Sequence, residues 1–494
     1  MTSPAKKVVI IGGGISGLTA AFSLSQLSSE NPIEIALFEA SPRFGSVIQT
    51  EIVEQCQIEF GPDSMLTAKP WGVNLMKSLG MENEIVETDA ANRRAFIAGK
   101  DSLYPMPEGF RLIAPASLTA LAASPCLSVK GKLRALCEPF LPRHESMSNG
   151  QLPDDFDESL TSFVTRRLGR EALERLAQPL FSGIYTADPD TLSIRATMPQ
   201  FLEYEAQYGS VIRGLQASAK NGSRTEAVRY SMFVAPQRGM GSLVDALVDQ
   251  LKRNKNVSLH TEKPVSQLIF NESKKRWQVG LVDQSILEAD AVILCLPAYG
   301  AAKLLKEIDS QLSELLSTIE YASSAVINFI VERDRVLHAL DGFGFVVPAD
   351  MKKNILAGSF STVKFKNRAP KDLTVLRAFV GGALFPEMME LSDAQMRERA
   401  FEDMSLYLSI TSPSRGLPYR EAIVSRWKDS MPQYKVGHRN TVNQIERRVS
   451  ALSGAFICGA AYEGVGIPDC IQNANKTAEA VHRSLFATVS QSPV

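Results

Sequence analysis

The chain has 494 residues, which is long for one domain and predicts two or three. Hydrophobic residues make up 45% and charged residues 22%, as in ordinary soluble enzymes, and a net charge of −1 gives no general reason to bind nucleic acid. The 6 cysteines are scattered without a Cys-x-x-Cys pair, and none of the 5 histidines stands at metal-ligand spacing. We therefore expect reduced thiols, a reducing compartment and no metal site.

The first predicted strand runs directly into a glycine-rich turn. Val8 to Ile11 form an apolar run, glycines follow at the spacing G-x-G-x-x-G, and a helical pattern begins at Leu18. In such a turn Gly12 allows the tight bend, Gly14 lets the backbone approach a pyrophosphate, and Gly17 lets helix and strand pack closely. The anion would lie at the positive end of the helix dipole, so the pattern predicts a dinucleotide site.

An acidic residue ends the second predicted strand and adds weight to this motif. Glu39 follows Ile33 to Phe38 and comes about 20 residues after Gly17, the distance expected of an acid that binds a ribose hydroxyl. Such an acid favours a ribose with a free 2′-hydroxyl, and therefore FAD or NAD rather than NADP. The alternative is a glycine-rich βα turn followed by a surface glutamate.

Residues 40–91 continue this domain. Ile48 to Phe60 predict a pair of short strands that end in Gly61-Pro62-Asp63-Ser64, a turn that either brings backbone close to a ligand or is an ordinary β-turn. Trp71 to Leu79 predict a helix that Gly80 closes. Lys6 and Lys7 precede the first apolar run as in a signal peptide, but the glycines interrupt that run, which favours a cytoplasmic strand.

The composition changes after residue 92. Leu112 to Val129 carry no charge and reach the lower limit of a membrane-spanning length, but two prolines interrupt them, so a pair of short helices is favoured over a transmembrane helix. The basic residues that follow, Lys130, Lys132 and Arg134, fit either contact with an anionic membrane surface or a solvated face. Further on, Leu160, Phe163, Val164 and Leu168 form an amphipathic helical stripe, and residues 216–230 are polar and predict a linker.

From Phe233 the pattern returns to α/β. Strands are predicted at residues 257–260, 265–270 and 277–282, and a separate sheet at 321–330, 343–347 and 374–382. Near the end, a buried strand at residues 455–459 precedes a glycine-rich turn at 462–467, and Pro468 and Asp469 open a long helix. The start of this helix would stabilise negative charge at the pyrimidine edge of a flavin; the alternative is a simple βα turn.

Several motifs now resemble one known family in the order in which they occur. They are the N-terminal glycine motif, Arg43-Phe44-Gly45, Gly61-Pro62-Asp63-Ser64, Phe181-Ser182-Gly183-Ile184-Tyr185, Gly342 to Pro348, Met431-Pro432-Gln433-Tyr434 and Tyr462 to Ile471. The chain resembles the oxygen-dependent porphyrinogen oxidases of haem synthesis, within the flavin amine oxidase superfamily, over essentially its whole length. The last motif is specific to this family, whereas the first is widespread.

The resemblance implies an α/β and α+β multidomain fold with noncovalent FAD. A Rossmann-like FAD-binding domain of the p-hydroxybenzoate hydroxylase type would be joined by a mixed-sheet substrate domain and a helical membrane-facing domain. The implied FAD-binding segments are 1–91, 232–298 and 446–494. The implied helical and first substrate-domain segment is 92–215, and the main substrate-binding segment is 299–445.

The resemblance also implies site residues. The cofactor-binding set is Gly12, Gly13, Gly14, Ile15, Ser16, Gly17, Glu39, Ala40, Arg43, Val47, Gly61, Pro62, Asp63, Ser64, Val265, Ala460, Val465, Gly466 and Ile467. The substrate-binding set is Arg94 or its neighbour Arg93 for a propionate, Gly183 where a side chain would crowd the macrocycle, and Phe343, Val346 and Phe379 around an apolar slot. Two positions depart from the family pattern. Ser46 stands where many members have a second glycine. The mammalian enzyme has a second arginine after its Gly-Pro turn, whereas here the turn is Gly-Pro-Asp-Ser and Lys69 comes a few residues later.

The implied reaction is the oxidation of a porphyrinogen to a porphyrin with O2 as acceptor and H2O2 as product, and it needs no assigned acid or base because the cofactor carries the chemistry. The substrate would be protoporphyrinogen IX or coproporphyrinogen III. Further expectations are a cytoplasmic protein, peripheral contact with the inner face of the cell membrane, a homodimer, and hand-over of the product to a chelatase. The alternatives are another flavin oxidase or desaturase, acting on an amine or a carotenoid, and a non-catalytic lipid-carrying protein of the same fold.

Overall fold

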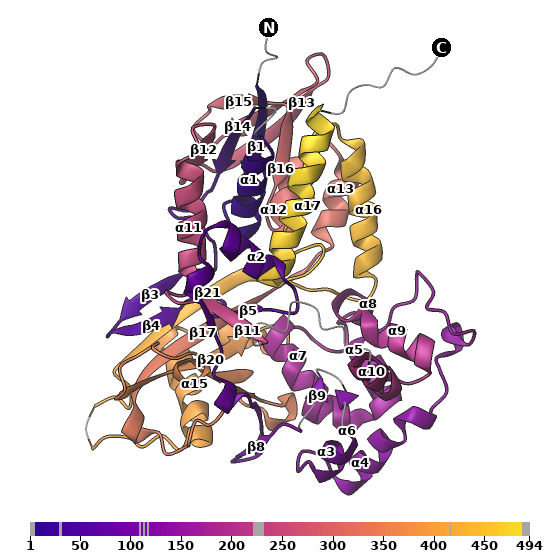
Figure 1. Cartoon of the computed structure of the whole chain (residues 1–494), viewed down its shortest axis with the longest axis vertical. Coiled ribbons are helices and arrows are strands. Elements are labelled where there is room, and N and C mark those ends of the chain that lie inside the picture. Colours follow the sequence, from indigo (N-terminus) through magenta and orange to yellow (C-terminus); the bar gives the residue numbers. More distant parts are fainter. Residues whose placement is uncertain are drawn as a thin grey trace.

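The computed structural model describes residues 5–28, 32–107, 110–111, 114–115, 118–220, 232–414 and 416–486. They form three bodies (Figure 1). The nucleotide body, at the top of Figure 1, surrounds a five-stranded parallel sheet, the sheet body at the lower left surrounds a seven-stranded mixed sheet, and the helical body at the lower right consists of residues 118–220.

The sheet of the nucleotide body has the strand order β12-β2-β1-β16-β22, with every neighbouring pair parallel. Its strands come from three separate stretches of the chain, so the fold brings both ends of the described chain into one body. The strands are β1 (Lys6–Ile11), β2 (Ile33–Phe38), β12 (Val257–His260), β16 (Ala291–Leu294) and β22 (Ala455–Ile457).

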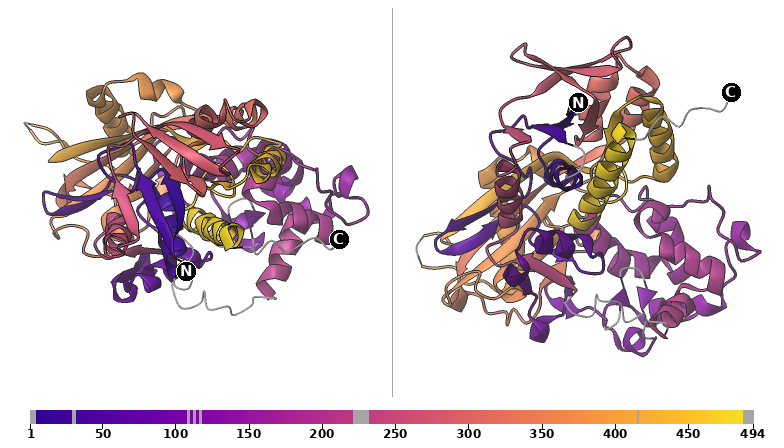
Figure 2. Two further views of the ribbon diagram at one scale, coloured as in Figure 1. Left: turned by 90° about the horizontal axis from the view of Figure 1, so that it is seen from above. Right: turned by 45° about the horizontal axis from the view of Figure 1, so that its top comes forward.

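Both faces of this sheet are covered, as a parallel sheet requires. Alternate residues of β1 pack into different cores: Val8 and Ile10 face helices α1 (Ile15–Leu27), α11 (Gly241–Lys252) and α17 (Ile467–Phe486), whereas Val9 faces the antiparallel meander β13-β14-β15. Figures 1 and 2 show α1 and the C-terminal α17 side by side. The other elements of this body are β13 (Val265–Asn271), β14 (Arg276–Leu281), β15 (Ile286–Ala289), α12 (Ala298–Leu305), α13 (Ser310–Ser317) and α16 (His438–Ala451).

The sheet body has the strand order β21-β17-β20-β19-β18-β7-β8. One face packs against helix α15 (Asp393–Leu408) through Met396, Ala400 and Met404, which leaves the other face for a ligand or a neighbouring body. The strands are β7 (Phe96–Ala98), β8 (Leu103–Pro105), β17 (Tyr321–Glu332), β18 (Gly344–Val346), β19 (Ala357–Phe360), β20 (Leu373–Gly381) and β21 (Glu421–Pro432).

The helical body has a core of its own, and the predicted stripe Leu160, Phe163, Val164 and Leu168 is fully buried in it. A buried ion pair between Glu138 and Arg167 supplements this apolar core. The helices are α3 (Leu118–Ala123), α4 (Val129–Leu136), α5 (Leu160–Leu168), α6 (Arg170–Ala172), a π-helical turn (Leu173–Ala177), α7 (Gln178–Tyr185), α8 (Ile194–Thr197), α9 (Pro199–Tyr208) and α10 (Val211–Lys220).

Two predictions for this region need correction. The stretch 216–230 is not a linker from its start, because α10 continues to Lys220, and residues 221–230 lie outside the described residues. The second helix predicted within Leu112 to Val129 begins only at Val129, and residues 112–113 and 116–117 are also outside the described part. Among the described residues, no helix combines the length and the apolar character needed to cross a membrane.

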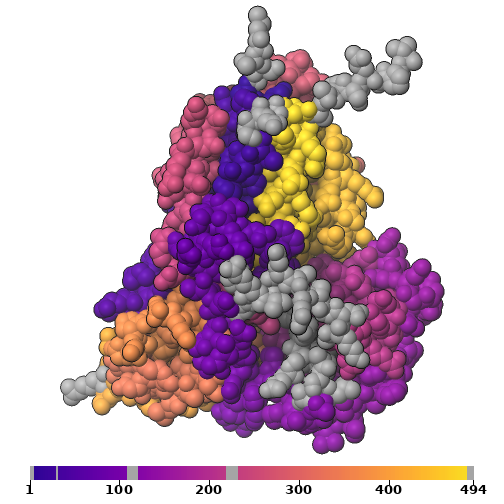
Figure 3. Space-filling model, viewed as in Figure 1, coloured from indigo at the N-terminus to yellow at the C-terminus, as the bar shows by residue number. Residues whose placement is uncertain are grey.

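The predicted short elements between β2 and β8 connect the bodies. They include the hairpin β3 (Thr50–Val53) and β4 (Cys56–Glu59), then β5 (Met65–Leu66), α2 (Trp71–Ser78) and β6 (Ile85–Glu87), and β5 and β6 pair with β11 (Phe233–Pro236). In the space-filling view this violet stretch runs down the middle of the molecule, from the nucleotide body to the other two (Figure 3).

Candidate functional site: a dinucleotide cradle beside an apolar slot

The glycines after β1 are required by close backbone contacts. Gly12 has φ +107°, and a Cβ atom at that position would lie 2.4 Å from the carbonyl oxygen of Cys295. A Cβ atom at Gly17 would lie 1.9 Å from the carbonyl oxygen of Gly12. At Gly14, by contrast, the nearest atom is 3.6 Å away, in Ser46, so the first turn of α1, with Ile15 and Ser16, leaves space at its N-terminus. This arrangement fits a pyrophosphate bound to free N–H groups.

Glu39 lies at the end of β2 and faces this turn. Its carboxylate accepts hydrogen bonds from the backbone N–H of Gly13 at 2.7 Å and of Ser41 at 2.8 Å. Its own carbonyl accepts a bond from Lys263 N–H at 3.0 Å, which brings the start of β13, and so Val265, to the same edge of the sheet. Ala40 is exposed next to Glu39. The residues predicted to hold the adenosine half of FAD therefore gather at one place.

The loop after Ala40 folds over the glycine turn. Arg43 donates to the carbonyl oxygens of Phe44 and Ile48, each at 3.1 Å, so its guanidinium shapes its own loop. The carbonyl oxygen of Val47 then approaches Gly61 so closely that a Cβ atom there would lie 1.9 Å from it. Glycine at position 61 therefore allows the Gly-Pro turn to pack directly against the loop that follows Ala40, which we call the dinucleotide loop.

The turn Gly61 to Ser64 is tied to the sheet body by buried charges. Lys364 Nζ lies 2.7 Å from Asp63 Oδ1 and 2.8 Å from Ser64 Oγ, and Arg377 lies 3.1 Å from the other Asp63 oxygen. Arg377 also donates to the carbonyl oxygen of Gly61. Burial alone would raise the pKa of the Asp63 carboxyl, but the Lys364 and Arg377 cations hold it well below its usual value.

The C-terminal motif closes the site from the other side. Tyr434 donates from its hydroxyl to the carbonyl oxygen of Ala460 at 2.5 Å. Asp469, in the first turn of α17, packs so tightly that Cβ atoms at Gly464 and Gly466 would lie 2.6 and 3.0 Å from it. Its carboxylate binds Lys69 Nζ at 2.6 Å, and this contact joins the loop after Ser64 to the start of α17, where Val465 and Ile467 lie.

An apolar row crosses the face of the seven-stranded sheet that lies opposite α15. In the strand registers Ile97 pairs with Val346, Val346 with Ala357, and Ala357 with Phe379, so these side chains share one face. Helix α7 lies over this row, because a Cβ atom at Gly183 would be 3.8 Å from Val346 and 4.0 Å from Ala357. Because Gly183 has no side chain, α7 approaches this apolar row closely, and we call the row together with Gly183 the apolar slot.

The remaining predicted substrate residues lie in the segments that lead into β7 and β18. Phe343 is half-buried just before β18, and its N–H donates to the carbonyl oxygen of Arg94 at 2.8 Å. Both Arg93 and Arg94 are exposed after a short 3₁₀ turn, and the Arg94 side chain pairs with Asp341 at 3.0 Å. Arg94 is therefore the member of the pair that an ion pair holds beside the seven-stranded sheet.

No ionisable side chain that we place at the slot is poised as a base near neutral pH. Burial raises the pKa of Tyr185 to about 12, and burial also raises the pKa of Tyr434 well above its usual value. Both hydroxyls therefore stay protonated at pH 7.

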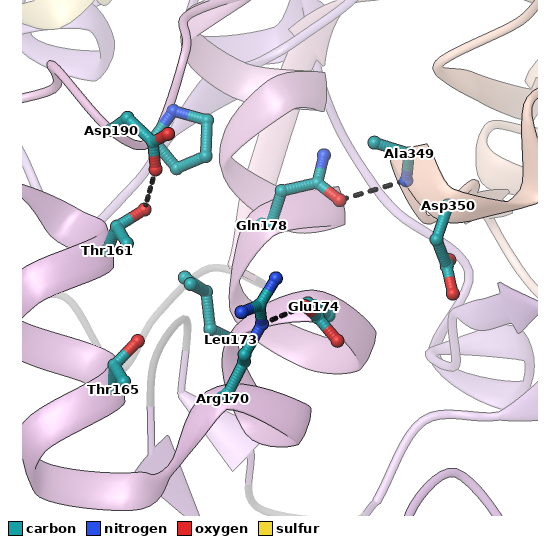
Figure 4. Close-up of a pocket in the computed structure, with 10 residues that line it drawn as sticks. Thr161, Thr165, Arg170, Leu173, Glu174, Gln178, Asp190, Ala349 and Asp350 are labelled. Atoms are coloured by element: carbon teal, nitrogen blue, oxygen red, sulfur yellow. Dashed lines mark hydrogen bonds and ion pairs between the residues drawn. The ribbon is translucent and has the colours of Figure 1, made fainter.

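A separate pocket of about 480 Å³ opens between the helical body and the turn after β18 (Figure 4). Apolar and polar residues both line it, and the polar ones include Thr161 and Thr165 of α5, Arg170, Glu174 and Asp350. The side chain of Gln178 accepts a hydrogen bond from Ala349 N–H at 3.0 Å, which fixes the start of α7 to the sheet body. The pocket contains none of the predicted site residues, but this bond helps to hold Gly183 over the slot.

Three buried polar residues near the Gly-Pro turn were missed by sequence reasoning. Asn328, Lys364 and Arg377 lie in or near strands whose sequences are otherwise apolar. The partners of Lys364 and Arg377 are about 300 residues away in the sequence. A polar side chain inside an otherwise apolar strand, such as Asn328 in β17 or Arg377 in β20, is the one signal that could have drawn attention to them.

Comparison with known proteins now adds the family. A family model described as flavin containing amine oxidoreductase matches residues 15–482. The chain therefore belongs to this family of oxidoreductases, and the predicted family, multidomain fold class and flavin cofactor are confirmed.

Individual relatives are more specific. Coproporphyrinogen III oxidase of Bacillus subtilis (strain 168) is 34% identical over 95% of this chain and 97% of that protein. The protein of the same name from Staphylococcus aureus is 30% identical over 96% of this chain and 99% of that one. A solved structure from Exiguobacterium sp. 255-15, provisionally assigned as a protoporphyrinogen oxidase, is similar at a TM-score of 0.83 and 28% identity, covering 97% of this chain and 99% of that one.

Proposed function

We propose that this protein is an FAD-dependent oxidase that converts a porphyrinogen, either protoporphyrinogen IX or coproporphyrinogen III, into the porphyrin. Oxygen is the acceptor and H2O2 the by-product, and the reaction belongs to haem synthesis. The observation that carries the proposal is that the Gly61 to Ser64 turn contacts both the loop beside the glycine motif, through Val47, and the apolar row of the seven-stranded sheet, through Arg377 and Phe379. The names of full-length relatives support the substrate class.

The residues of the chain bind and orient the reactants. The turn from Gly12 to Gly17 and Glu39 would hold the adenosine and pyrophosphate half of FAD, while Gly61 to Ser64, Ala460 and Val465 to Ile467 would line its ring system. A bound flavin supplies the acceptor for a hydride from the substrate. Gly183, Val346 and Phe379 exclude water and hold the macrocycle flat, so that repeated cycles act on one fixed geometry.

Arg94 is proposed to bind a propionate of the substrate. A guanidinium pairs with a carboxylate through two parallel hydrogen bonds, and the half-exposed pair with Asp341 shows that Arg94 already holds a carboxylate beside the seven-stranded sheet. Replacement of Arg94 with alanine should lower kcat/KM about tenfold, as expected for a charge-assisted bond in a half-exposed site. The same change at the exposed neighbour Arg93 is the matched control, and unchanged KM and kcat in Arg94→Ala would exclude this role.

Direct turnover is the test of the proposed function. The purified holoenzyme, held without oxygen with each of the two porphyrinogens, should produce porphyrin fluorescence only when air is admitted, together with H2O2. The faster substrate identifies which porphyrinogen is used. A protein that binds no FAD, or that binds FAD but oxidises neither porphyrinogen, would refute the proposal.

We also propose that the helical body contacts an anionic membrane surface from the cytoplasmic side. Val129 and Leu133, one turn apart on α4, are 74% and 60% exposed, and Phe140, in the 3₁₀ turn that follows this helix, is 82% exposed. Lys130 and Lys132 are next to Val129 and Leu133. Leu133→Asp should reduce co-sedimentation with vesicles that contain phosphatidylglycerol. Ile286→Asp, on the distant meander, is a control that should leave it unchanged. Equal sedimentation of both variants would exclude this surface. A homodimer and hand-over to a chelatase stay predictions.

A further inference from the structure

The Gly61 to Ser64 turn rests on a buried group of charges that the proposed reaction has not used. Asp63 is bound by Lys364 and Arg377, and the side chains of these three residues are 13%, 12% and 2% exposed. Next to them, Glu59 pairs with Arg368 at 3.6 Å, and the side chains of these two residues are 6% and 4% exposed. With all five side chains ionised, three cations face two carboxylates, so the group has one excess positive charge.

Three of the polar atoms here, Arg368 Nη1, Arg377 Nε and Asn328 Oδ1, have no hydrogen-bond partner within the described residues. Arg377 Nε is buried and donates to nothing, and Asn328 Oδ1 is buried and accepts nothing. Asn328 and Arg377 are paired in the register of β17 and β20, so their side chains are neighbours on one face of the sheet. A buried donor and a buried acceptor left open side by side cost free energy unless a water or a ligand satisfies them. They therefore point to a polar ligand atom or a buried water at this spot.

The position of the charge group follows from its contacts in two directions. Towards the cofactor, Arg377 binds the carbonyl oxygen of Gly61, and Gly61 packs on the carbonyl oxygen of Val47 in the dinucleotide loop. Towards the substrate, the guanidinium of Arg377 lies 5.1 Å from the ring centroid of Phe379, which belongs to the slot. The charge group thus lies between the dinucleotide cradle and the slot. For a substrate in the slot to reach the redox-active ring of the cofactor, that ring must lie next to this group.

We propose that Lys364 and Arg377 raise the reduction potential of the bound FAD through the excess positive charge of this group, with Asp63 limiting that charge. This inference rests on the proposed function. Two-electron reduction adds negative charge to the ring system, and a cation in a site shielded from water stabilises the reduced form more than the oxidised form. Lys364, Arg377 and Asp63 would be positioning residues that set the driving force for oxidation of the substrate.

The test is the midpoint potential of FAD in the intact holoenzyme, measured by anaerobic reduction with a reference dye. Arg377→Met and Lys364→Met should each shift the reduction equilibrium at least tenfold towards oxidised FAD, which is about 30 mV for a two-electron couple. Asp63→Asn should shift it in the opposite direction, and Arg377→Lys should stay within about threefold of the wild type because it keeps the charge. Only an electrostatic role predicts opposite signs for the two kinds of variant.

Two controls separate this effect from damage to the fold. Arg420→Met removes an arginine at the edge of the same sheet, half-exposed and paired with Glu332, and should not change the potential. Lys364→Met is informative even where loss of the fully buried Arg377 prevents folding. If wild-type protein binds no FAD, the proposed function fails. If all variants bind FAD with the same potential, or if Asp63→Asn shifts it in the same direction as Lys364→Met, the charge proposal alone is overturned.

Discussion

The carboxylate of Glu39 accepts a hydrogen bond from the backbone N–H of Gly13 at 2.7 Å. This contact joins the end of β2 to the glycine turn after β1, which are neighbouring strands of one parallel sheet. In open parallel sheets ligands bind at the carboxyl ends of the strands, and both residues lie there. We therefore predict that the Glu39 carboxylate, which now accepts from the Gly13 N–H, accepts a hydrogen bond from a ribose hydroxyl when the cofactor binds.

Replacement of Glu39 with alanine should weaken FAD binding about tenfold or more, because a charge-assisted hydrogen bond contributes roughly 1.5–3 kcal/mol. Titration of the apoprotein with FAD, followed by flavin fluorescence, measures the effect. Glu34→Ala is the matched control, since Glu34 lies in the same strand but is exposed. Equal affinities of the two variants would show that Glu39 does not bind the cofactor.

Substitutions of Gly183 test the slot, because they should keep or raise Tm while they impair activity. A Cβ atom there would be in ordinary contact with Val346 and Ala357, so Gly183→Ala should fold, and the gain in helix propensity of about 1 kcal/mol should keep or raise Tm. The added methyl group narrows the slot, so KM for the porphyrinogen should rise, and Gly183→Leu should abolish turnover. Gly300→Ala, in helix α12, is the control: it changes helix propensity without loss of activity. A fully active Gly183→Leu would place the substrate elsewhere.

The helical body depends on a buried ion pair. Glu138 and Arg167 are 0% and 1% exposed, and Glu138 also accepts bonds from Ser210 Oγ and Val211 N–H at the start of α10. Arg167→Met should lower the free energy of unfolding by about 3–5 kcal/mol, because it leaves a buried carboxylate without its cation. Urea unfolding measures this. Glu174→Gln breaks the exposed pair with Arg170 and should have no measurable effect; similar losses in both variants would contradict the explanation.

Stability should also depend on His438. Burial lowers the pKa of His438, which stacks on Tyr434, from 6.5 to about 4. The folded protein therefore holds the neutral imidazole, while the unfolded chain binds a proton below pH 6.5. The contribution of neutral His438 to the free energy of unfolding is complete above pH 6.5. It is lost as the pH falls towards 4, by about 3 kcal/mol in total. His438→Phe keeps the stacked ring but cannot titrate.

Urea unfolding at pH 7, 5.5 and 4.5 measures the pH dependence of wild type and His438→Phe. The free energy of unfolding of the wild type, relative to that of His438→Phe, should fall as the pH falls through this window. A difference that is the same at all three pH values would show that His438 does not titrate differently in the folded and unfolded states.

Local patterns allowed much of the nucleotide body to be predicted. The apolar strand before Gly12 and the acid at Glu39 are local features whose spacing reflects contacts between neighbouring strands. The amphipathic stripe from Leu160 to Leu168 likewise shows its buried face directly. The end of α10 was misjudged because polar residues are as common on an exposed helix as in a linker.

The sequence by itself determined the glycine cradle, the acid that faces it and the family, because these depend on spacings within short stretches. Only the tertiary structure decided which polar residues stand between the Gly61 to Ser64 turn and the apolar row of the sheet. Lys364 and Arg377 meet Asp63 across about 300 residues, and β-strand periodicity gives the face of a residue but not its partner from another segment. A buried charge is defined by the groups that surround it, and those groups come together only when the chain has folded.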